Sequence, residues 1–193
     1  MLIVVIGRAG SGKTTISKEV CKLTDLPLVE MSTIVQNLQQ RSKEQRGQIN
    51  INKDQREKQN PDWLWCEVYQ EIVKVGKGSD KSCIISGIRE PYLLYKIREL
   101  KSDVFVIGLE VSLFNRYSRL CARDGFMGVK DFRSIDNGTK EKDGYVGDNE
   151  LGLDITLTGC DVIVNANASL GQSVGQIERE LFNKGIYSLI RRS

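Results

Sequence analysis

Residues 7–14 read GRAGSGKT and directly follow a short apolar run, LIVVI, at residues 2–6. The octapeptide matches the pattern G-x-x-x-x-G-K-[ST] at every specified position. Its glycines allow a tight turn whose backbone N–H groups point toward phosphate oxygens. The segment TTISKEVCKL that follows is compatible with a helix, whose N-terminus adds partial positive charge. The stretch therefore predicts a buried strand, a phosphate-binding loop and a helix, in that order.

The loop is the predicted nucleotide site. Lys13 is expected to reach the β- and γ-phosphates, and the Thr14 hydroxyl is expected to coordinate Mg²⁺. ATP is the expected donor, with GTP as the alternative. The other nucleotide-binding residues expected in this stretch are Gly7, Arg8, Ala9, Gly10, Ser11, Gly12 and Thr15. The alternative, a glycine-rich turn that ends in Lys-Thr by chance, is disfavoured by the strand before the loop and the helix after it.

Composition narrows the function classes. The chain has 193 residues, 40% hydrophobic and 27% charged, and a net charge of +3. This charge suits an anionic small molecule and is below that of a dedicated nucleic-acid binder. Without any histidine, histidine acid–base chemistry is excluded, and five scattered cysteines without a CxxC pair disfavour zinc. Apolar runs are too short for a membrane span or a signal peptide, so we expect a cytoplasmic protein with reduced thiols.

Short β-branched runs alternate with stretches compatible with helices, which predicts an α/β doubly wound sheet. Because the runs are continuously apolar, we expect parallel strands buried on both faces. The expected strands are 2–6, 27–30, 83–86, 104–109 and 161–165, and the expected helices are 13–23, about 32–45, about 61–75, 90–100, 112–123 and 171–184. The polar stretches 41–60 and 124–152 are expected to be either solvated loops or mobile covers over a substrate.

Arginines follow two of the expected strands. Arg89 comes shortly after the strand 83–86, at the carboxyl edge of the sheet, and its guanidinium fork suits a phosphate. Arg116, Arg119 and Arg123 fall on one face of a helix and could neutralise charge on a transferring phosphoryl group. Arg119 and Arg123 are the expected catalytic pair, because they should lie nearer the glycine-rich loop. Solvated surface arginines are the alternative for both groups.

Four stretches, GRAGSGKT, IISGIREP, RLCARDG and CDVIVNANASLGQ, follow one another in the order found in P-loop kinases. With them the chain resembles the nucleoside monophosphate kinase branch of these enzymes, together with dephospho-CoA kinases, archaeal dephospho-CoA-kinase-like proteins and viral deoxynucleoside monophosphate kinases. The resemblance implies one P-loop kinase domain over residues 1–193, with a parallel five-stranded sheet flanked by helices. It also implies an acceptor-binding insertion at about 32–75 and a lid at about 116–150.

The resemblance implies roles for single residues as well. Arg89 would hold the phosphate of the acceptor, and Arg119 and Arg123 would belong to the lid helix. Asn165 would begin a stretch that passes near the adenine of ATP. The segment MSTIVQNLQQRS, residues 31–42, would line the acceptor pocket.

The chain departs from this family in the acceptor region. Relatives commonly carry an acidic residue where this chain has Ser86, an aspartate at Thr33 and an arginine at Gln36. A serine cannot act as a base at neutral pH, so the acceptor site is altered. Nearby acids that could substitute are Glu30, Asp62 and Glu90.

Asp62 is the expected catalytic carboxylate among them, because Trp63 and Trp65 follow it closely. Side chains at i and i+2 point to different faces of a helix, so both tryptophans should not pack inward. One of them is then expected to stack against a planar acceptor. The alternative is that both rings cover hydrophobic surface.

These features predict an ATP-dependent phosphotransferase, a small-molecule kinase that moves the γ-phosphoryl group to a nucleotide-type acceptor. A (deoxy)nucleoside monophosphate is favoured, because an acceptor that is already anionic needs positioning and charge neutralisation more than a base. The alternatives are a dephospho-CoA-kinase-like hydroxyl kinase, a phage-type kinase of a hydroxylated base in DNA, and a nucleotide-binding switch without transfer. DNA is thus a less favoured partner than a small molecule, no membrane partner is expected, and the pattern indicates no particular oligomeric state.

Overall fold

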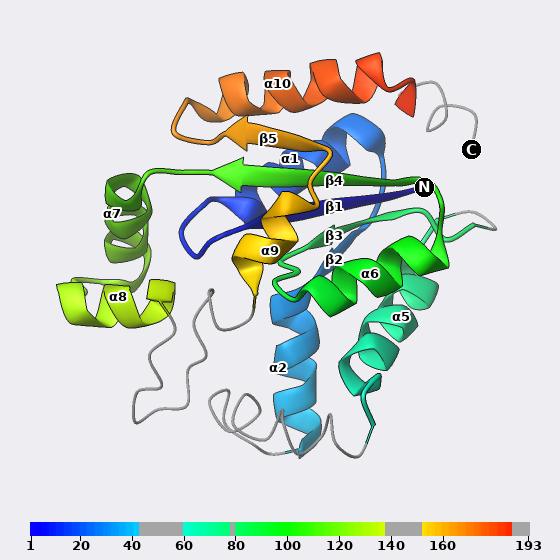
Figure 1. Ribbon diagram of the computed structural model, residues 1–193, viewed down its shortest axis with the longest axis horizontal. Coiled ribbons are helices and arrows are strands. Elements are labelled where there is room, and N and C mark those ends of the chain that lie inside the picture. Colours follow the sequence, from blue (N-terminus) through cyan, green and yellow to red (C-terminus); the bar gives the residue numbers. More distant parts are fainter. Residues whose placement is uncertain (43–59, 78–79, 138–151, 187–193) are drawn as a thin grey trace.

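The computed structural model describes residues 1–42, 60–77, 80–137 and 152–186. Five parallel strands form a sheet in the order β2-β3-β1-β4-β5. The strands are β1 (Leu2–Gly7), β2 (Leu28–Glu30), β3 (Cys83–Ser86), β4 (Val104–Glu110) and β5 (Val162–Asn165). Because all of them run the same way, their carboxyl ends meet at one edge of the sheet, on the left in Figure 1. The predicted fold class, a parallel five-stranded α/β sheet flanked by helices, is confirmed.

Strand β1 lies in the middle of the sheet and is buried throughout. Leu2, Val4 and Ile6 belong to the hydrophobic core on one face, whereas Ile3 and Val5 belong to the core on the other. Both faces therefore exclude water, which explains why the sequence of β1 is continuously apolar rather than alternating.

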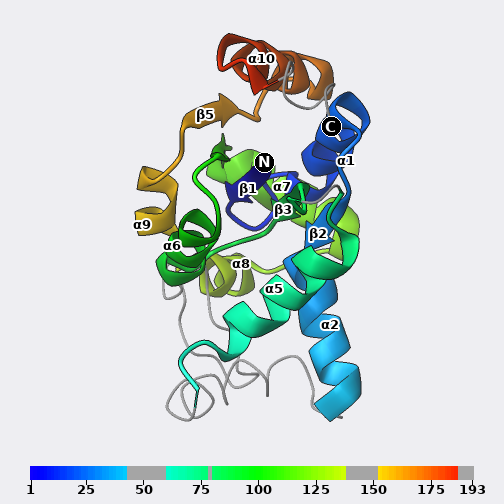
Figure 2. The ribbon, with the colours of Figure 1, turned by 90° about the vertical axis from the view of Figure 1, so that its right-hand side faces the viewer.

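Helices cover both faces of this sheet. One face packs against α1 (Lys13–Thr24) and α10 (Leu170–Asn183), and the opposite face packs against α2 (Met31–Ser42), α5 (Trp63–Val75), α6 (Pro91–Leu100) and α9 (Leu153–Thr158). Figure 2, which looks along the strands, shows α1 and the pair α6 and α9 on opposite sides of the sheet. The arrangement is the layered packing that parallel strands require.

Two further helices, α7 (Leu113–Asp124) and α8 (Val129–Asn137), lie beyond the carboxyl ends of the strands (Figure 1). Of the two alternatives for residues 124–152, a solvated loop is wrong for α8, and a mobile cover stays a prediction. The buried Phe132 anchors this helix, because its ring packs edge-on against Tyr117 with centroids 5.3 Å apart. Asp131 accepts a hydrogen bond of 3.2 Å from the Gly128 N–H at the start of the helix. Residues 138–151, the rest of that stretch, lie outside the described residues.

Helix α9 was not expected from the sequence either. Its six residues follow Gly152, and Leu153 within it is completely buried in the core. The other expected helices and strands are confirmed, with ends that differ by a few residues; part of the expected helix 32–45 and most of the polar stretch 41–60 lie outside the described residues. Within the part of the chain that the structure describes, no helix has the length and apolar character needed to cross a bilayer.

Candidate active site

The loop between β1 and α1 has the backbone geometry that its glycines suggested. Gly10 and Gly12 have φ of 76° and 86°, a region that side chains strongly disfavour. A Cβ on Gly10 would lie 2.7 Å from the carbonyl oxygen of Arg116. Glycine is therefore required at this position twice, for its φ and for the close approach of α7.

Lys13 is folded back over the start of this loop. Its Nζ donates hydrogen bonds of 2.7 Å to the carbonyl oxygen of Gly7 and 2.9 Å to that of Arg8. Thr14 and Thr15, in the first turn of α1, are both exposed. The ammonium group, the threonine hydroxyls and the N-terminus of α1 thus converge where a chain of phosphates could bind.

Ser11 adds a second indication of an anion. Its side chain is buried inside the loop, and within the described part of the chain its Oγ has no hydrogen-bond partner. A buried hydroxyl without a partner costs free energy. A phosphate oxygen held by the loop would supply the missing acceptor.

The carboxyl edge of the sheet presents oxygen ligands suited to Mg²⁺. Glu30 ends β2 in register with Ser86 at the end of β3, which in turn pairs with Val5 of β1. Glu30 Oε1 is buried and, among the described residues, has no hydrogen-bond partner. The same residues contain no cluster of three or more metal-ligating side chains. Thr14 and Glu30 therefore fit a Mg²⁺ ion that keeps several waters and binds through nucleotide phosphates, rather than one held by the protein alone.

The arginines of α7 occupy different environments. Arg119 donates two hydrogen bonds, one of 3.4 Å from Nη1 to the Ser11 carbonyl oxygen and one of 2.7 Å from Nη2 to the Ala166 carbonyl oxygen. It therefore joins the phosphate loop to the turn after β5. Arg123 pairs with Asp124 at 2.6 Å, which lowers the pKa of that carboxyl group, and its side chain is 69% exposed. The buried Arg116 lies over the ring of Phe132, at 5.5 Å from its centroid.

The sequence ranked Arg119 and Arg123 above Arg116, but Arg116 also lies close to the phosphate loop. The backbone of Arg116 approaches Gly10 directly, because the N-terminal half of α7 packs on the loop. Arg119, the other expected residue, does contact the loop.

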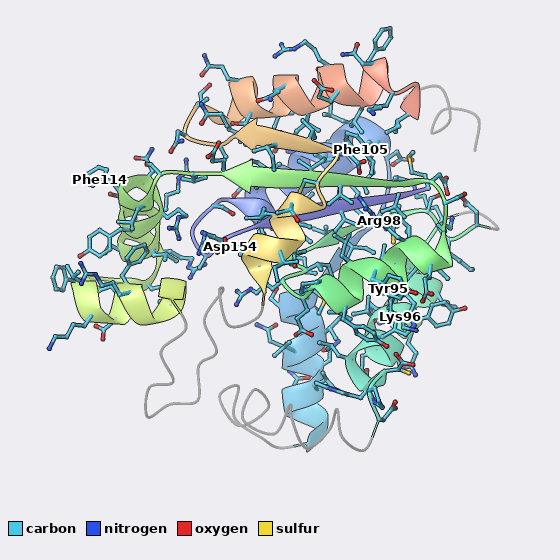
Figure 3. All side chains as sticks on the ribbon, viewed as in Figure 1. Tyr95, Lys96, Arg98, Phe105, Phe114 and Asp154 are labelled. Atoms are coloured by element: carbon cyan, nitrogen blue, oxygen red, sulfur yellow. The ribbon has the colours of Figure 1, made fainter. Side chains whose placement is uncertain are left out.

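Helix α9 contacts two loops of the site. Asp154 accepts a hydrogen bond from Nη2 of Arg8 in the phosphate loop. Thr156 Oγ1 donates a hydrogen bond of 2.7 Å to the carbonyl oxygen of Arg89, in the turn after β3. Figure 3 shows Asp154 at the end of α9 that faces the phosphate loop. Sequence reasoning missed Asp154, because it lies 146 residues from Arg8 and belongs to no motif.

Asn165, expected near adenine, ends β5 at the same edge of the sheet. Its Oδ1 accepts a hydrogen bond of 3.0 Å from the N–H of Asn167. Oδ1 of Asn167 accepts a hydrogen bond of 2.8 Å from the N–H of Ser112, which connects the turn after β5 to the start of α7.

Asp62 contacts α6 rather than the phosphate loop. It accepts a hydrogen bond from the Tyr92 hydroxyl, which raises the pKa of that tyrosine, and it lies 3.7 Å from Nζ of Lys96. Trp63 and Trp65 are both partly buried and both pack against the same core. The expectation that only one of them could pack inward is wrong, because each ring reaches the core with part of its surface. In the acceptor region, Thr33 and Gln36 of α2 are exposed.

The fold and the loop together define the class of the protein. The structure is similar to a gluconokinase from Sinorhizobium meliloti 1021 (TM-score 0.51, 14% identity, 94% of this chain and 95% of that chain covered). It is also similar to the shikimate kinase of Aquifex aeolicus vf5 (TM-score 0.57, 15% identity, 96% and 99% covered). At such identities the similarity shows the fold alone, and the chain has the P-loop kinase fold that the sequence predicted.

The family follows from the sequence comparison. The family model AAA_18, described as an AAA domain, matches residues 3–135, which is more than half of the chain. The chain therefore belongs to the AAA_18 family. No curated protein sequence matches it.

Proposed function

We propose that the protein is an ATP-dependent phosphotransferase that moves the γ-phosphoryl group to a nucleotide-type acceptor, with a (deoxy)nucleoside monophosphate preferred. The single observation that supports it most is the complete phosphate loop, with Lys13 folded over its start and the buried Ser11 Oγ lacking a partner among the described residues. Phosphoryl transfer depends on positioning and charge neutralisation, and this loop supplies both.

Each group has a role in this proposal. Lys13 contacts the β- and γ-phosphates, and Thr14 coordinates the Mg²⁺ that accompanies ATP. Arg119 fastens the loop to the turn after β5, where Asn165 lies beside the adenine. Arg89 holds the phosphate of the acceptor, and Arg123 enters with the lid.

The acceptor preference rests on the end of β3. Ser86 there is buried and cannot act as a base at neutral pH. A nucleoside monophosphate offers an oxygen that is already anionic, so its transfer needs no proton acceptor. The acceptor region is assigned to residues of about 32–75 and the lid to about 116–150, within one kinase domain over residues 1–193. Of these, residues 43–59 and 138–151 lie outside the described residues.

A second candidate is a kinase of a hydroxyl group, as in dephospho-CoA-kinase-like enzymes. The specific observation that favours it is Glu30, whose Oε1 is buried at the carboxyl edge without a hydrogen-bond partner in the described part of the chain. A carboxylate in this position could accept the proton of an acceptor hydroxyl. Both candidates use the same loop and the same Mg²⁺ site. They differ in whether Glu30 must also accept a proton, so the size of the effect of Glu30 on transfer distinguishes them.

The test is a transfer assay with γ-labelled ATP across nucleoside monophosphates, dephospho-CoA and DNA containing a hydroxylated base. The variant Glu30→Gln keeps the size of the side chain and removes its basicity. Loss of a general base should lower kcat by about a hundredfold or more. If the acceptor is a monophosphate, the loss should be smaller, about tenfold, since Glu30 then acts only through the metal's waters.

The outcomes separate the candidates. Transfer to a monophosphate that survives Glu30→Gln supports the first, and transfer to a hydroxyl that is lost in Glu30→Gln supports the second. ATP hydrolysis that no acceptor stimulates contradicts both and favours a nucleotide-binding switch.

A further inference from the structure

We propose that Asp154 positions the guanidinium group of Arg8 against the terminal phosphate of the bound nucleotide, and thereby gives the loop a preference for triphosphates over diphosphates. The inference rests on the proposed function, because it takes ATP as the nucleotide. It adds a residue that no motif of the sequence indicates.

Arg8 is the second residue of the loop, and the terminal phosphate is expected beside this part of the loop. In loops of this type, the lysine reaches the β- and γ-phosphates. Nζ of Lys13 lies 2.9 Å from the carbonyl oxygen of Arg8 itself and 2.7 Å from that of Gly7. The Arg8 side chain therefore starts beside the γ-phosphate position, and its planar fork of donors suits phosphate oxygens.

Asp154 is held in place independently of Arg8. Leu153, its neighbour in α9, is completely buried in the core. Gly152, just before α9, has a φ of 77°, and a Cβ there would lie 3.0 Å from Cδ of Pro91. Thr156 binds the Arg89 carbonyl oxygen at 2.7 Å. A carboxylate fixed on such an element can orient the flexible arginine that it contacts, which lowers the entropy that Arg8 loses when it binds phosphate.

The charges of the pair must also balance. The Asp154 side chain is 62% exposed and Arg8 is 23% exposed. If Arg8 were lost alone, an uncompensated carboxylate would remain beside the phosphate site and repel the nucleotide. Loss of both partners should therefore be less harmful to triphosphate binding than loss of Arg8 alone. A simple docking contact between α9 and the loop would not produce this order.

The experiment is isothermal titration calorimetry of the full chain with the Mg²⁺ complexes of a non-hydrolysable ATP analogue and of ADP. Asp154→Asn should weaken binding of the ATP analogue about tenfold and change ADP binding less than about threefold. Arg8→Gln should weaken binding of the ATP analogue further, and the double variant Arg8→Gln/Asp154→Asn should recover part of that loss. Asp154→Glu should restore the wild-type ratio of affinities. Glu99→Gln, which alters an exposed ion pair on α6, is the matched control and should change neither affinity.

Several results would overturn the inference. They are an unchanged ratio of the two affinities in Asp154→Asn, an equal loss of both, or a double variant that binds the ATP analogue more weakly than Arg8→Gln. A lowered Tm with an unchanged ratio would make Asp154 a purely structural residue. If the ratio changes as expected but no acceptor is phosphorylated, the proposed function fails and this inference stands. If the wild-type chain binds neither nucleotide, both fail.

Discussion

Lys13 shows how a single side chain prepares the loop for phosphate. Its ammonium group contacts the carbonyl oxygens of Gly7 and Arg8, so it already occupies the start of the loop. A phosphate would replace these neutral acceptors by charged oxygens, which adds direct attraction between opposite charges to hydrogen bonds whose donor is already ionised. Gly10 and Gly12 set the backbone around it with their positive φ. Little of the loop therefore needs to reorganise on binding, which favours affinity.

The cysteines give a prediction at the scale of single residues. Burial raises the pKa of Cys83 to about 12 and that of Cys160 to about 11, whereas Cys66 on α5 is exposed. At pH 8 about one Cys83 thiol in ten thousand is a thiolate, the form that reacts with iodoacetamide. We expect mass spectrometry of briefly labelled native protein to find Cys66 modified well before Cys83 and Cys160.

The control for this labelling is the unfolded protein. In urea all five cysteines, which are free in the structure, should be labelled at similar rates. Equal labelling of Cys66 and Cys83 in the native protein would show that β3 is not buried as described.

At the scale of elements, two helices fasten the loops of the site to one another. Arg119 of α7 connects the phosphate loop with the turn after β5, through the carbonyl oxygens of Ser11 and Ala166. Helix α9 connects the phosphate loop with the turn after β3, through Asp154 and Thr156. The three loops that follow β1, β3 and β5 are therefore held in a common arrangement before any ligand binds.

Removal of the Arg119 contact should loosen this arrangement. Arg119→Ala should lower the affinity for ATP about tenfold, because two charge-assisted hydrogen bonds that hold the loops are lost. The free energy of unfolding should fall by about 2 kcal/mol, because bonds to a charged group are lost while the core is untouched. Calorimetry and urea denaturation measure the two quantities. Arg179→Ala, on the exposed surface of α10, should change neither value. A large loss of stability in Arg119→Ala with unchanged ATP affinity would contradict the assignment.

The elements differ in how well the sequence predicted them. Strands such as β1 and β3 were predictable, because a parallel strand buried on both faces leaves a continuous apolar run. Helix α8 was not, because its nine residues are largely polar and, among those whose burial the structure describes, only Phe132 is deeply buried. Helix α9 has six residues, which is too short for a helical repeat to be visible in the sequence.

At the scale of the whole molecule, the strand order places the phosphate loop at the middle of the carboxyl edge. Strand β1, which precedes the loop, lies between β3 and β4. Arg89 and Glu30 follow from β3 and β2 on one side of the loop, and Asn165 ends β5 on the other. One side is therefore suited to the acceptor and the other to the base of the nucleotide, as the proposed function requires.

The candidate site could be predicted from the sequence only where its residues are contiguous in the chain. The phosphate loop is contiguous, so its pattern locates the whole stretch from Gly7 to Thr14 and specifies Gly7, Gly12, Lys13 and Thr14. The pair of Arg8 and Asp154 depends instead on how α9 packs, and no spacing in the sequence reports it. Glu30 was recognisable only as one acid among several. Its buried oxygen distinguishes it from Asp62, whose carboxylate contacts Tyr92 and Lys96.

The most direct test of the central claim is phosphoryl transfer from γ-labelled ATP to a nucleoside monophosphate, measured for the wild-type chain and for Lys13→Ala. We predict a labelled diphosphate product with the wild-type chain. In Lys13→Ala, kcat/KM should fall by at least about a hundredfold, because the charge that stabilises the transferring group is removed. The Tm should stay close to that of the wild type. Absence of labelled product from the wild-type chain, or equal transfer by folded Lys13→Ala, would contradict the account.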